Sequence, residues 1–292
     1  MDSADSRQTC LHLKISGISG SDIDMEKVKQ FGYSEYSVRR WLAGRHTVPI
    51  IVLKNSSMRG SRIDYVNFKH SKFKVKLPKM DEKLFYFAGI VLGDGNVCGS
   101  IRASGHRRFR IKIEKLRTKF SEFCLPKLIE EVFGFKPPMY FWKKKSETVE
   151  IDINSKIVSR ILTNVFGFSY GKKIDKPVDF VLQFPERLQL YFIAGLLDTD
   201  GGYSGKTFAF CNSSKKMVLY VKNFMEKRNI PTRFYAQKKG PFEWFLLFVP
   251  ARSRQRFLET FPLMNERKYG VPLGRFELPV SRSLPSFVAK TV

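Results

Sequence analysis

Cysteine and histidine are scarce in this chain, with four residues of each among 292. No two cysteines form a Cys-x-x-Cys pair, and the histidines form no cluster with metal-ligand spacing. This scatter argues against a structural zinc site and against a disulfide framework. It predicts reduced thiols, which are typical of an intracellular protein.

Long apolar runs are absent as well. No segment reaches the roughly 20 apolar residues that a transmembrane helix needs. The first ten residues, MDSADSRQTC, contain no hydrophobic signal region, and Asp2 and Asp5 argue against an organelle transit peptide. We therefore expect no membrane partner and a location inside the cell, in the cytoplasm or nucleoid.

Acidic residues are few for the number of basic ones. The chain has 27 Asp and Glu against 52 Lys and Arg, which gives a formal net charge of +25. An excess of this size indicates a polyanionic partner, of which nucleic acid is the commonest. The excess is present both in residues 1–80 and in the remainder, so both parts are expected to touch the partner.

What the chain does contain is an internal repeat. Residues 85–95 read FYFAGIVLGDG, residues 193–201 read IAGLLDTDG, and the aligned aspartates Asp94 and Asp200 lie 106 positions apart. Each copy is apolar on all sides, which describes a helix buried within a protein. Repetition at the spacing of a domain predicts two structurally equivalent halves.

Small residues recur at a spacing of four in both copies. They are Gly89 and Gly93 in the first copy, and Gly195 and Thr199 in the second. Small side chains four apart lie on one face of a helix and let two backbones approach closely. We therefore expect the two segments to pack together at the centre of a molecule with pseudo-twofold symmetry.

Each copy ends in Asp-Gly. Glycine after a helix is the usual C-terminal cap, and two capped helices are the simplest interpretation. A carboxylate, however, is unfavourable at the negative end of a helix dipole, and Asp94 and Asp200 would also repel each other if the helices pair. A divalent cation resolves both conflicts, because hard cations prefer oxygen ligands. The pattern therefore favours a metal site.

The segments FAGIVLGDG and IAGLLDTDG resemble the two motifs of the LAGLIDADG, or dodecapeptide, homing endonucleases in their single-chain form. The resemblance covers roughly residues 84–268. The first motif departs from the family pattern at Gly93 and at Leu92, where the second copy has Asp198. The resemblance implies an α+β fold of two pseudo-twofold αββαββα halves packed through the motif helices.

The resemblance also implies a chemistry for the ends of the motifs. Asp94 and Asp200, beside Gly93 and Thr199, are expected to bind Mg²⁺, with Mn²⁺ as a substitute, and to cut the two DNA strands. Oxygen ligands of this kind suit either metal.

Two further pairs of residues recur between the halves. Lys173 follows Phe166 by seven residues, and Lys268 follows Phe261 by the same interval. The resemblance implies that these lysines act beside the metals and stabilise charge on the phosphate. A surface role and a role for Lys172 in place of Lys173 are alternatives. The resemblance further implies that Glu114 and Asn212, at the ends of matched strands, hold water near the site.

Basic side chains line the predicted strands. The strand RRFRIKIEK alternates basic and apolar residues, so one face of its sheet is expected to be basic and to suit the major groove of DNA. Phe208 and Phe210 occupy the corresponding parity in the second half, so either the register slips by one or that DNA face is partly aromatic. The DNA-binding candidates are Arg39, Arg40, Arg102, Arg107, Arg108, Arg110, Lys112, Lys143, Lys145, Lys206, Arg233, Lys238 and Lys239.

The N-terminal region has its own helical pattern. Residues 21–44 predict two helices separated by Gly32, and VPIIVLKN predicts a third with Pro49 in its first turn. Arg39 and Arg40 on the second helix make this region similar to a helix-turn-helix. A small helical cap with a basic face is the alternative.

The predicted organisation has five parts. They are an N-terminal helical, helix-turn-helix-like module at 1–55, a basic connector at 56–80, two motif-bearing halves at 81–175 and 176–270, and a C-terminal tail at 271–292.

The function expected from the resemblance is that of a monomeric, Mg²⁺-dependent double-strand DNA endonuclease. It would hydrolyse phosphodiesters at a long asymmetric target in intron homing. An intron RNA maturase, with intron RNA as a partner, and a catalytically silent DNA-binding regulator are the alternatives on the same scaffold.

Overall fold

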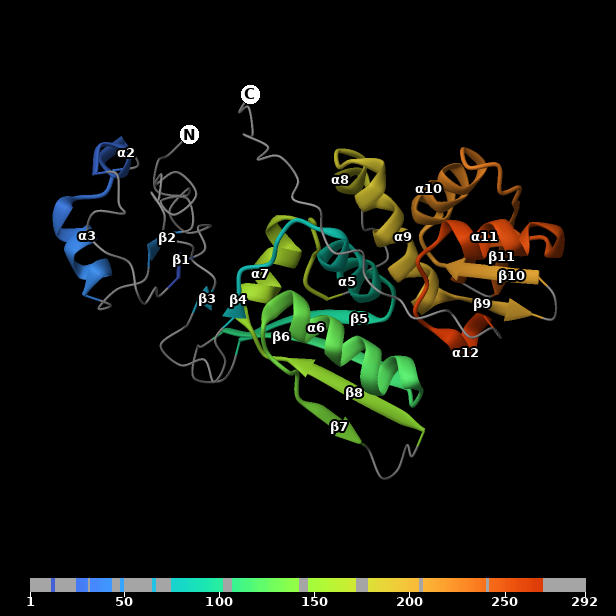
Figure 1. The fold of residues 1–292 in the computed structure, drawn as a ribbon, viewed down its shortest axis with the longest axis horizontal. Helices are drawn as coiled ribbons and strands as arrows, with labels where there is room; N and C mark the ends of the chain where they lie inside the picture. Colours follow the sequence, from blue (N-terminus) through green and yellow to red (C-terminus); the bar gives the residue numbers. More distant parts are fainter. Residues whose placement is uncertain are drawn as a thin grey trace.

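The computed structural model describes residues 12–13, 25–30, 32–43, 48–49, 65–66, 75–101, 107–141, 147–171, 178–204, 207–239 and 242–269. Within them the fold is a mixed α+β arrangement with two antiparallel four-stranded sheets and a pair of central helices (Figure 1).

The two repeated segments form the central helices α5 (Glu82–Gly93) and α9 (Glu186–Asp200). Almost every residue of both is buried, as their apolar composition predicts. The helices cross where Gly89 meets Gly195: a Cβ added at Gly195 would lie 3.1 Å from Cα of Gly89. The predicted packing of the two segments through their small residues is confirmed.

The first half follows α5 in the predicted order. Its strands are β5 (Gly95–Ile101), β6 (Arg107–Leu116), β7 (Met139–Phe141) and β8 (Thr148–Ile153), hydrogen-bonded in the order β5-β6-β8-β7. The helices α6 (Leu125–Phe133) and α7 (Lys156–Asn164) complete the half. A π-helical turn at Phe120–Cys124 precedes α6, which has Pro126 in its first turn.

The second half repeats the same topology after α9. Its strands are β9 (Gly201–Ser204), β10 (Thr207–Asn212), β11 (Arg233–Lys239) and β12 (Phe242–Val249), in the order β11-β12-β10-β9. The helices are α10 (Lys215–Glu226) and α11 (Arg254–Thr260). The short helices α8 (Asp179–Leu182) and α12 (Glu266–Tyr269) flank this half and were not expected.

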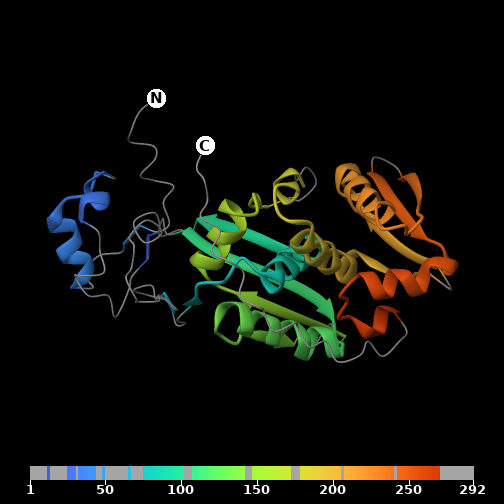
Figure 2. The same cartoon turned by 45° about the horizontal axis from the view of Figure 1, so that its top comes forward.

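The two halves lie on either side of the paired helices, as both views show (Figures 1 and 2). Each sheet turns its apolar side chains toward the helices of its own half. Buried Ile111 and Ile113 do so in the first half, and buried Phe208 and Phe210 in the second. Phe166 and Phe261, the recurring pair at the end of each half, are both buried.

The register of the second sheet resolves the alternative left open by the sequence. Gly95 pairs with Ile113 in the first sheet, whereas Gly201 pairs with Phe210 in the second. Phe210 is therefore the counterpart of Ile113, and the repeat is offset by 97 residues on this strand instead of 106. The two offsets differ by an odd number of residues. Because side chains alternate between the faces of a strand, Phe208 and Phe210 therefore lie on the core face.

The N-terminal prediction holds for two helices and fails for the third. α2 (Met25–Gln30) and α3 (Glu35–Leu42) are separated by Gly32, whose φ of 76° is left-handed. Ser34 caps α3, and the rings of Tyr33 and Trp41 pack edge to face. The remaining short strands of this region are β1 (His12–Leu13), β2 (Val48–Pro49), β3 (Tyr65–Val66) and β4 (Val75–Lys76).

The third predicted helix was expected to start at Val48, but Val48–Pro49 is a strand paired with β1. The segment VPIIV is rich in β-branched residues, which favour strands and disfavour helices. The rest of that segment lies outside the described residues. None of the helices that the structure describes combines the length and apolarity needed to cross a membrane.

Candidate active site

The candidate site lies where α5 and α9 end side by side. A Cβ added at Gly93 would overlap the side-chain hydroxyl of Thr199, so the last turns of the two helices touch. Asp94 is the residue after α5 and Asp200 is the last residue of α9. The two carboxylates therefore leave the helix pair at neighbouring points.

The glycines after the aspartates serve close packing and not left-handed caps. Neither Gly95 nor Gly201 has a positive φ. A Cβ added at Gly95 would lie 2.7 Å from Cα of Val91, and one at Gly201 would lie 2.5 Å from the carbonyl oxygen of Leu197. Gly201 is the C-cap of α9 without a left-handed φ, whereas Asp94 is the C-cap of α5, and each glycine lets a strand start directly against its motif helix.

Each aspartate meets one polar side chain from the second strand of its own sheet. Lys115 of β6 forms an ion pair with the Asp94 carboxylate, and its side chain is only 11% exposed. The Asn212 amide of β10 donates to Oδ2 of Asp200 over 2.7 Å. With the offset of 97 residues on this strand, Lys115 and Asn212 are equivalent positions. The site is therefore symmetric in geometry and asymmetric in charge.

Glu114 is not the counterpart of Asn212. Glu114 lies opposite Glu150 in the strand register, and its side chain is on the outward face of the sheet. Lys115 is on the inward face, together with Ile111 and Ile113. The sequence reasoning matched Glu114 to Asn212 and missed Lys115. The available signal was a lysine continuing the apolar face of a strand, a position at which a lysine needs a buried partner.

Asp198, which has no acidic counterpart in the first motif, binds the C-terminal segment of the second half. Its fully buried carboxylate accepts hydrogen bonds from the Tyr86 hydroxyl and from the backbone N–H groups of Met264 (2.7 Å) and Asn265 (3.3 Å). Burial raises the pKa of Asp198 to about 7. Leu92 occupies the equivalent position of the first motif and is buried among apolar residues.

Lys268 lies beside the second aspartate. The segment held by Asp198 leads into α12, from which the Lys268 ammonium donates to the carbonyl oxygen of Thr199. Burial lowers the pKa of Lys268, and the carboxylates of Asp198 and Asp200 partly offset this shift. The structure thus places one of the two predicted lysines next to Asp200. The other, Lys173, and its neighbour Lys172 lie outside the described residues.

The predicted DNA-binding residues are only partly described. Those outside the described residues are Arg102, Lys143, Lys145 and Lys206, and the side chains of Arg107, Arg108 and Lys239 are also undescribed. On α3, Arg39 pairs with Glu35 and Arg40 lies over the Tyr36 ring. On β11, Arg233 and Lys238 are exposed and lie on opposite faces of the strand by alternation.

On the outward face of the first sheet, the described cations of β6 are paired with carboxylates. The Arg110 guanidinium donates to Asp152 (2.7 Å) and Glu150 (2.8 Å), and Lys112 pairs with Glu150 at 2.7 Å. Both carboxylates come from β8, which pairs beside β6. The hydrogen bond to Asp152 raises the pKa of Arg110. These contacts hold the two cations in fixed positions across the sheet.

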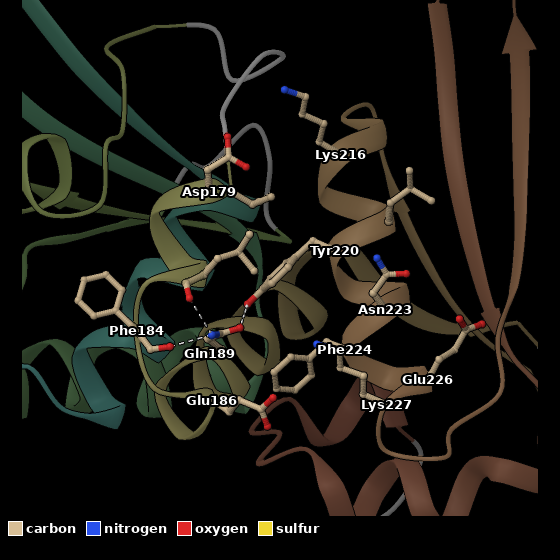
Figure 3. A pocket seen from close by; sticks show the side chains of 13 residues that line it. Asp179, Phe184, Glu186, Gln189, Lys216, Tyr220, Asn223, Phe224, Glu226 and Lys227 are labelled. Atoms are coloured by element: carbon tan, nitrogen blue, oxygen red, sulfur yellow. Dashed lines mark hydrogen bonds between the residues drawn. The ribbon is translucent and has the colours of Figure 1, made fainter.

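A pocket of about 890 Å³ lies at the opposite end of α9 from Asp200, between α8, α9 and α10 (Figure 3). At its wall the Gln189 amide donates to the carbonyl oxygen of Phe184 (2.7 Å) and accepts from the Tyr220 hydroxyl (3.0 Å). Glu186, in the first turn of α9, also lines it. Because α9 runs 15 residues from Glu186 to Asp200, this pocket is separate from the carboxylate site.

Comparison with known proteins agrees with this geometry. Residues 187–262 match the family described as LAGLIDADG-like domain. The structure of I-DmoI in complex with DNA and Mn matches with a TM-score of 0.51 and 18% identity, over 63% of this chain and 97% of that one. Structures of mesophilic variants of the homing endonuclease I-DmoI match with a TM-score of 0.52 and 16% identity, over 62% and 91%.

Residues 187–262 thus form a LAGLIDADG-like domain. The family match covers the second motif helix and the second sheet, and the structural matches extend the LAGLIDADG fold to the first half. The chain is also 29% identical over 131 residues to reverse gyrase from Methanocaldococcus jannaschii. That match covers 45% of this chain and spans only 7% of the length of the reverse gyrase.

The donor set at the LAGLIDADG helix ends fits a hard divalent cation. The two carboxylates supply oxygen ligands, while the Thr199 carbonyl oxygen accepts from Lys268 and the Asn212 amide donates to Asp200. Among the described residues no three His, Cys, Asp or Glu side chains gather closely enough to hold a metal alone. A cation held here would need further oxygen ligands, such as substrate phosphate and water.

Proposed function

We propose that this chain is a metal-dependent endonuclease that cuts both strands of a long, asymmetric DNA site. The observation that carries the proposal is the pair of carboxylates, Asp94 and Asp200, at the touching ends of two helices. Two equivalent acidic positions, one in each half, suit a duplex whose two strands must both be cut. The fold of I-DmoI, solved with DNA and Mn, supports the same assignment.

The protein groups have distinct parts in this proposal. A divalent metal bound at the carboxylates would activate water and stabilise the leaving oxygen. Asp94 and Asp200 would hold that metal, and Asn212 orients the Asp200 carboxylate through its 2.7 Å hydrogen bond. Lys115 and Lys268 place positive charge beside the two aspartates, where negative charge develops on the phosphate.

The test is cleavage of a randomised DNA library with Mg²⁺ or Mn²⁺, and without metal. We expect discrete double-strand cuts that need metal and disappear in Asp94→Asn and Asp200→Asn. Asp179→Asn, an exposed carboxylate on α8, is the matched control and should cut normally. Undiminished cutting by both active-site variants would refute the proposal.

The same assay separates the alternatives from the endonuclease. Salt-sensitive DNA binding without cutting would favour a silent regulator, and preferential binding of structured intron RNA would favour a maturase. The ion pair between Lys115 and Asp94 gives the silent regulator some support, because an ammonium already neutralises one of the two carboxylates.

A further inference from the structure

The outward faces of the two sheets differ sharply in chemistry. Strand pairing assigns ten described residues to the outward face of the first sheet: Asn96, Cys98, Arg110, Lys112, Glu114, Leu116, Tyr140, Thr148, Glu150 and Asp152. The same reasoning assigns ten to the second: Gly202, Thr207, Ala209, Cys211, Arg233, Tyr235, Gln237, Trp244, Leu246 and Phe248. Five of the first set are charged, but only Arg233 is charged in the second.

The second face combines apolar residues on β10 and β12 with aromatic residues on β11 and β12. Ala209 and Cys211 lie on β10, next to Leu246 on β12. Trp244 is 44% exposed and Tyr235 is 47% exposed. The Tyr235 and Phe248 rings pack edge to face at 5.5 Å. An apolar surface of this kind on a chain of net charge +25 needs a partner that is not simply anionic.

This face is continuous with the candidate active site. Cys211 directly precedes Asn212, which contacts Asp200, and β9 starts at Gly201 immediately after Asp200. A phosphodiester held at Asp200 therefore brings the neighbouring bases onto this sheet. Outward residues recur every two positions, a step of about 7 Å that matches about two base pairs along a strand.

We infer that the second sheet reads its half of the target through thymine methyl groups, and that the first sheet reads its half through Arg110 and Lys112. The inference rests on the proposed function. Thymine presents a C5 methyl group in the major groove, where small and aromatic apolar side chains can contact it. In the first sheet, Glu150 and Asp152 orient the cations, and oriented arginine and lysine suit guanine.

The test replaces thymine with uracil, which removes the methyl group and leaves the pairing edge unchanged. Duplexes are first selected by binding from a randomised library without divalent metal. Uracil is then substituted throughout one half-site or the other. We expect binding to weaken by about three- to fourfold for each contacted methyl in one half-site, with no change in the other.

Variants assign the sensitive half-site to a sheet. Trp244→Ser and Tyr235→Ser should abolish most of the uracil effect. Tyr140→Ser is the matched control, because Tyr140 is an outward tyrosine of the first sheet with 48% exposure. All three side chains are exposed, so folding should be preserved, and thermal unfolding checks this.

The outcomes distinguish this inference from the proposed function. A protein that cuts DNA but is indifferent to uracil retains the endonuclease function and overturns the inference. Uracil sensitivity lost in Tyr140→Ser but kept in Trp244→Ser also overturns it. So does a dimer that dissociates in Trp244→Ser with DNA preference unchanged, because the face would then bind a second copy. Uracil-sensitive binding without cutting supports the inference and refutes the proposed endonuclease function.

Discussion

Single residues make the two repeated motifs unequal. Asp198 and Leu92 occupy equivalent positions, yet one accepts hydrogen bonds and the other packs in an apolar core. Lys115 and Asn212 are likewise equivalent, and one gives its aspartate a positive partner while the other gives it a neutral amide. These differences are expected to make the two strand cuts unequal in rate.

Asp198→Ala should lower the free energy of unfolding by about 3 kcal/mol, because the Tyr86 hydroxyl and the N–H groups of Met264 and Asn265 would lose a buried acceptor. Urea unfolding in metal-free buffer measures the loss. Asp179→Ala, at an exposed carboxylate, serves as the control. Equal stability of the two variants would contradict this role for Asp198.

Lys115→Met should slow one strand cut more than the other, so that nicked DNA accumulates. Removing one group that stabilises developing charge typically costs about 10²-fold in rate. Time courses on supercoiled plasmid carrying the target resolve nicked and linear products. Equal slowing of both cuts would show that Lys115 serves the whole site and not the Asp94 half alone.

The element that organises the fold is the pair of helices α5 and α9. Their close approach requires glycine at the crossing, since a Cβ at Gly89 would overlap the Phe192 carbonyl oxygen and one at Gly195 would overlap that of Tyr86. Backbone atoms cannot move aside as a flexible side chain can. The distance between the two carboxylates depends on this crossing.

Gly89→Val should therefore destabilise the fold by about 3 kcal/mol and also reduce cutting, because the helix ends would separate. Gly202→Ala is the control for stability, since no atom lies within 4 Å of an added Cβ there. Thermal unfolding is measured on both variants, and cleavage by Gly89→Val is compared with that of the unsubstituted protein. A Gly89→Val protein with normal stability would refute the tight crossing.

At the scale of the whole molecule, the charge of +25 is not concentrated on the central part of the first sheet. There the cations are matched by Glu150 and Asp152. Attraction to the phosphate backbone must then come from other basic residues, such as exposed Arg233 at the edge of the second sheet. Phosphate contacts position the protein, and base contacts specify the sequence.

This division predicts a difference in salt dependence. Arg233→Ala should reduce the slope of log binding constant against log salt concentration by about 1. Trp244→Ser should weaken binding to the selected duplex with the slope unchanged. Fluorescence anisotropy titrations over a range of salt concentrations measure both. A change of slope in Trp244→Ser would argue against an apolar contact at that position.

The sequence by itself determined the repeat, the buried helix pair and the order of strands and helices in each half. It did so because apolar periodicity, small residues four apart and the two Asp-Gly ends are local signals. It also predicted a site at Asp94 and Asp200, since paired carboxylates at helix ends need a compensating charge.

Only the tertiary structure decided the strand registers, and those decided the rest of the site. A register change of one residue moves every side chain of a strand to the other face of the sheet. The sequence alone therefore could not decide whether Glu114 or Lys115 contacts Asp94, and it could not place Phe208 in the core. The contacts of Asp198 with Met264 and of Arg110 with Asp152 join residues distant in the chain, which no local pattern encodes.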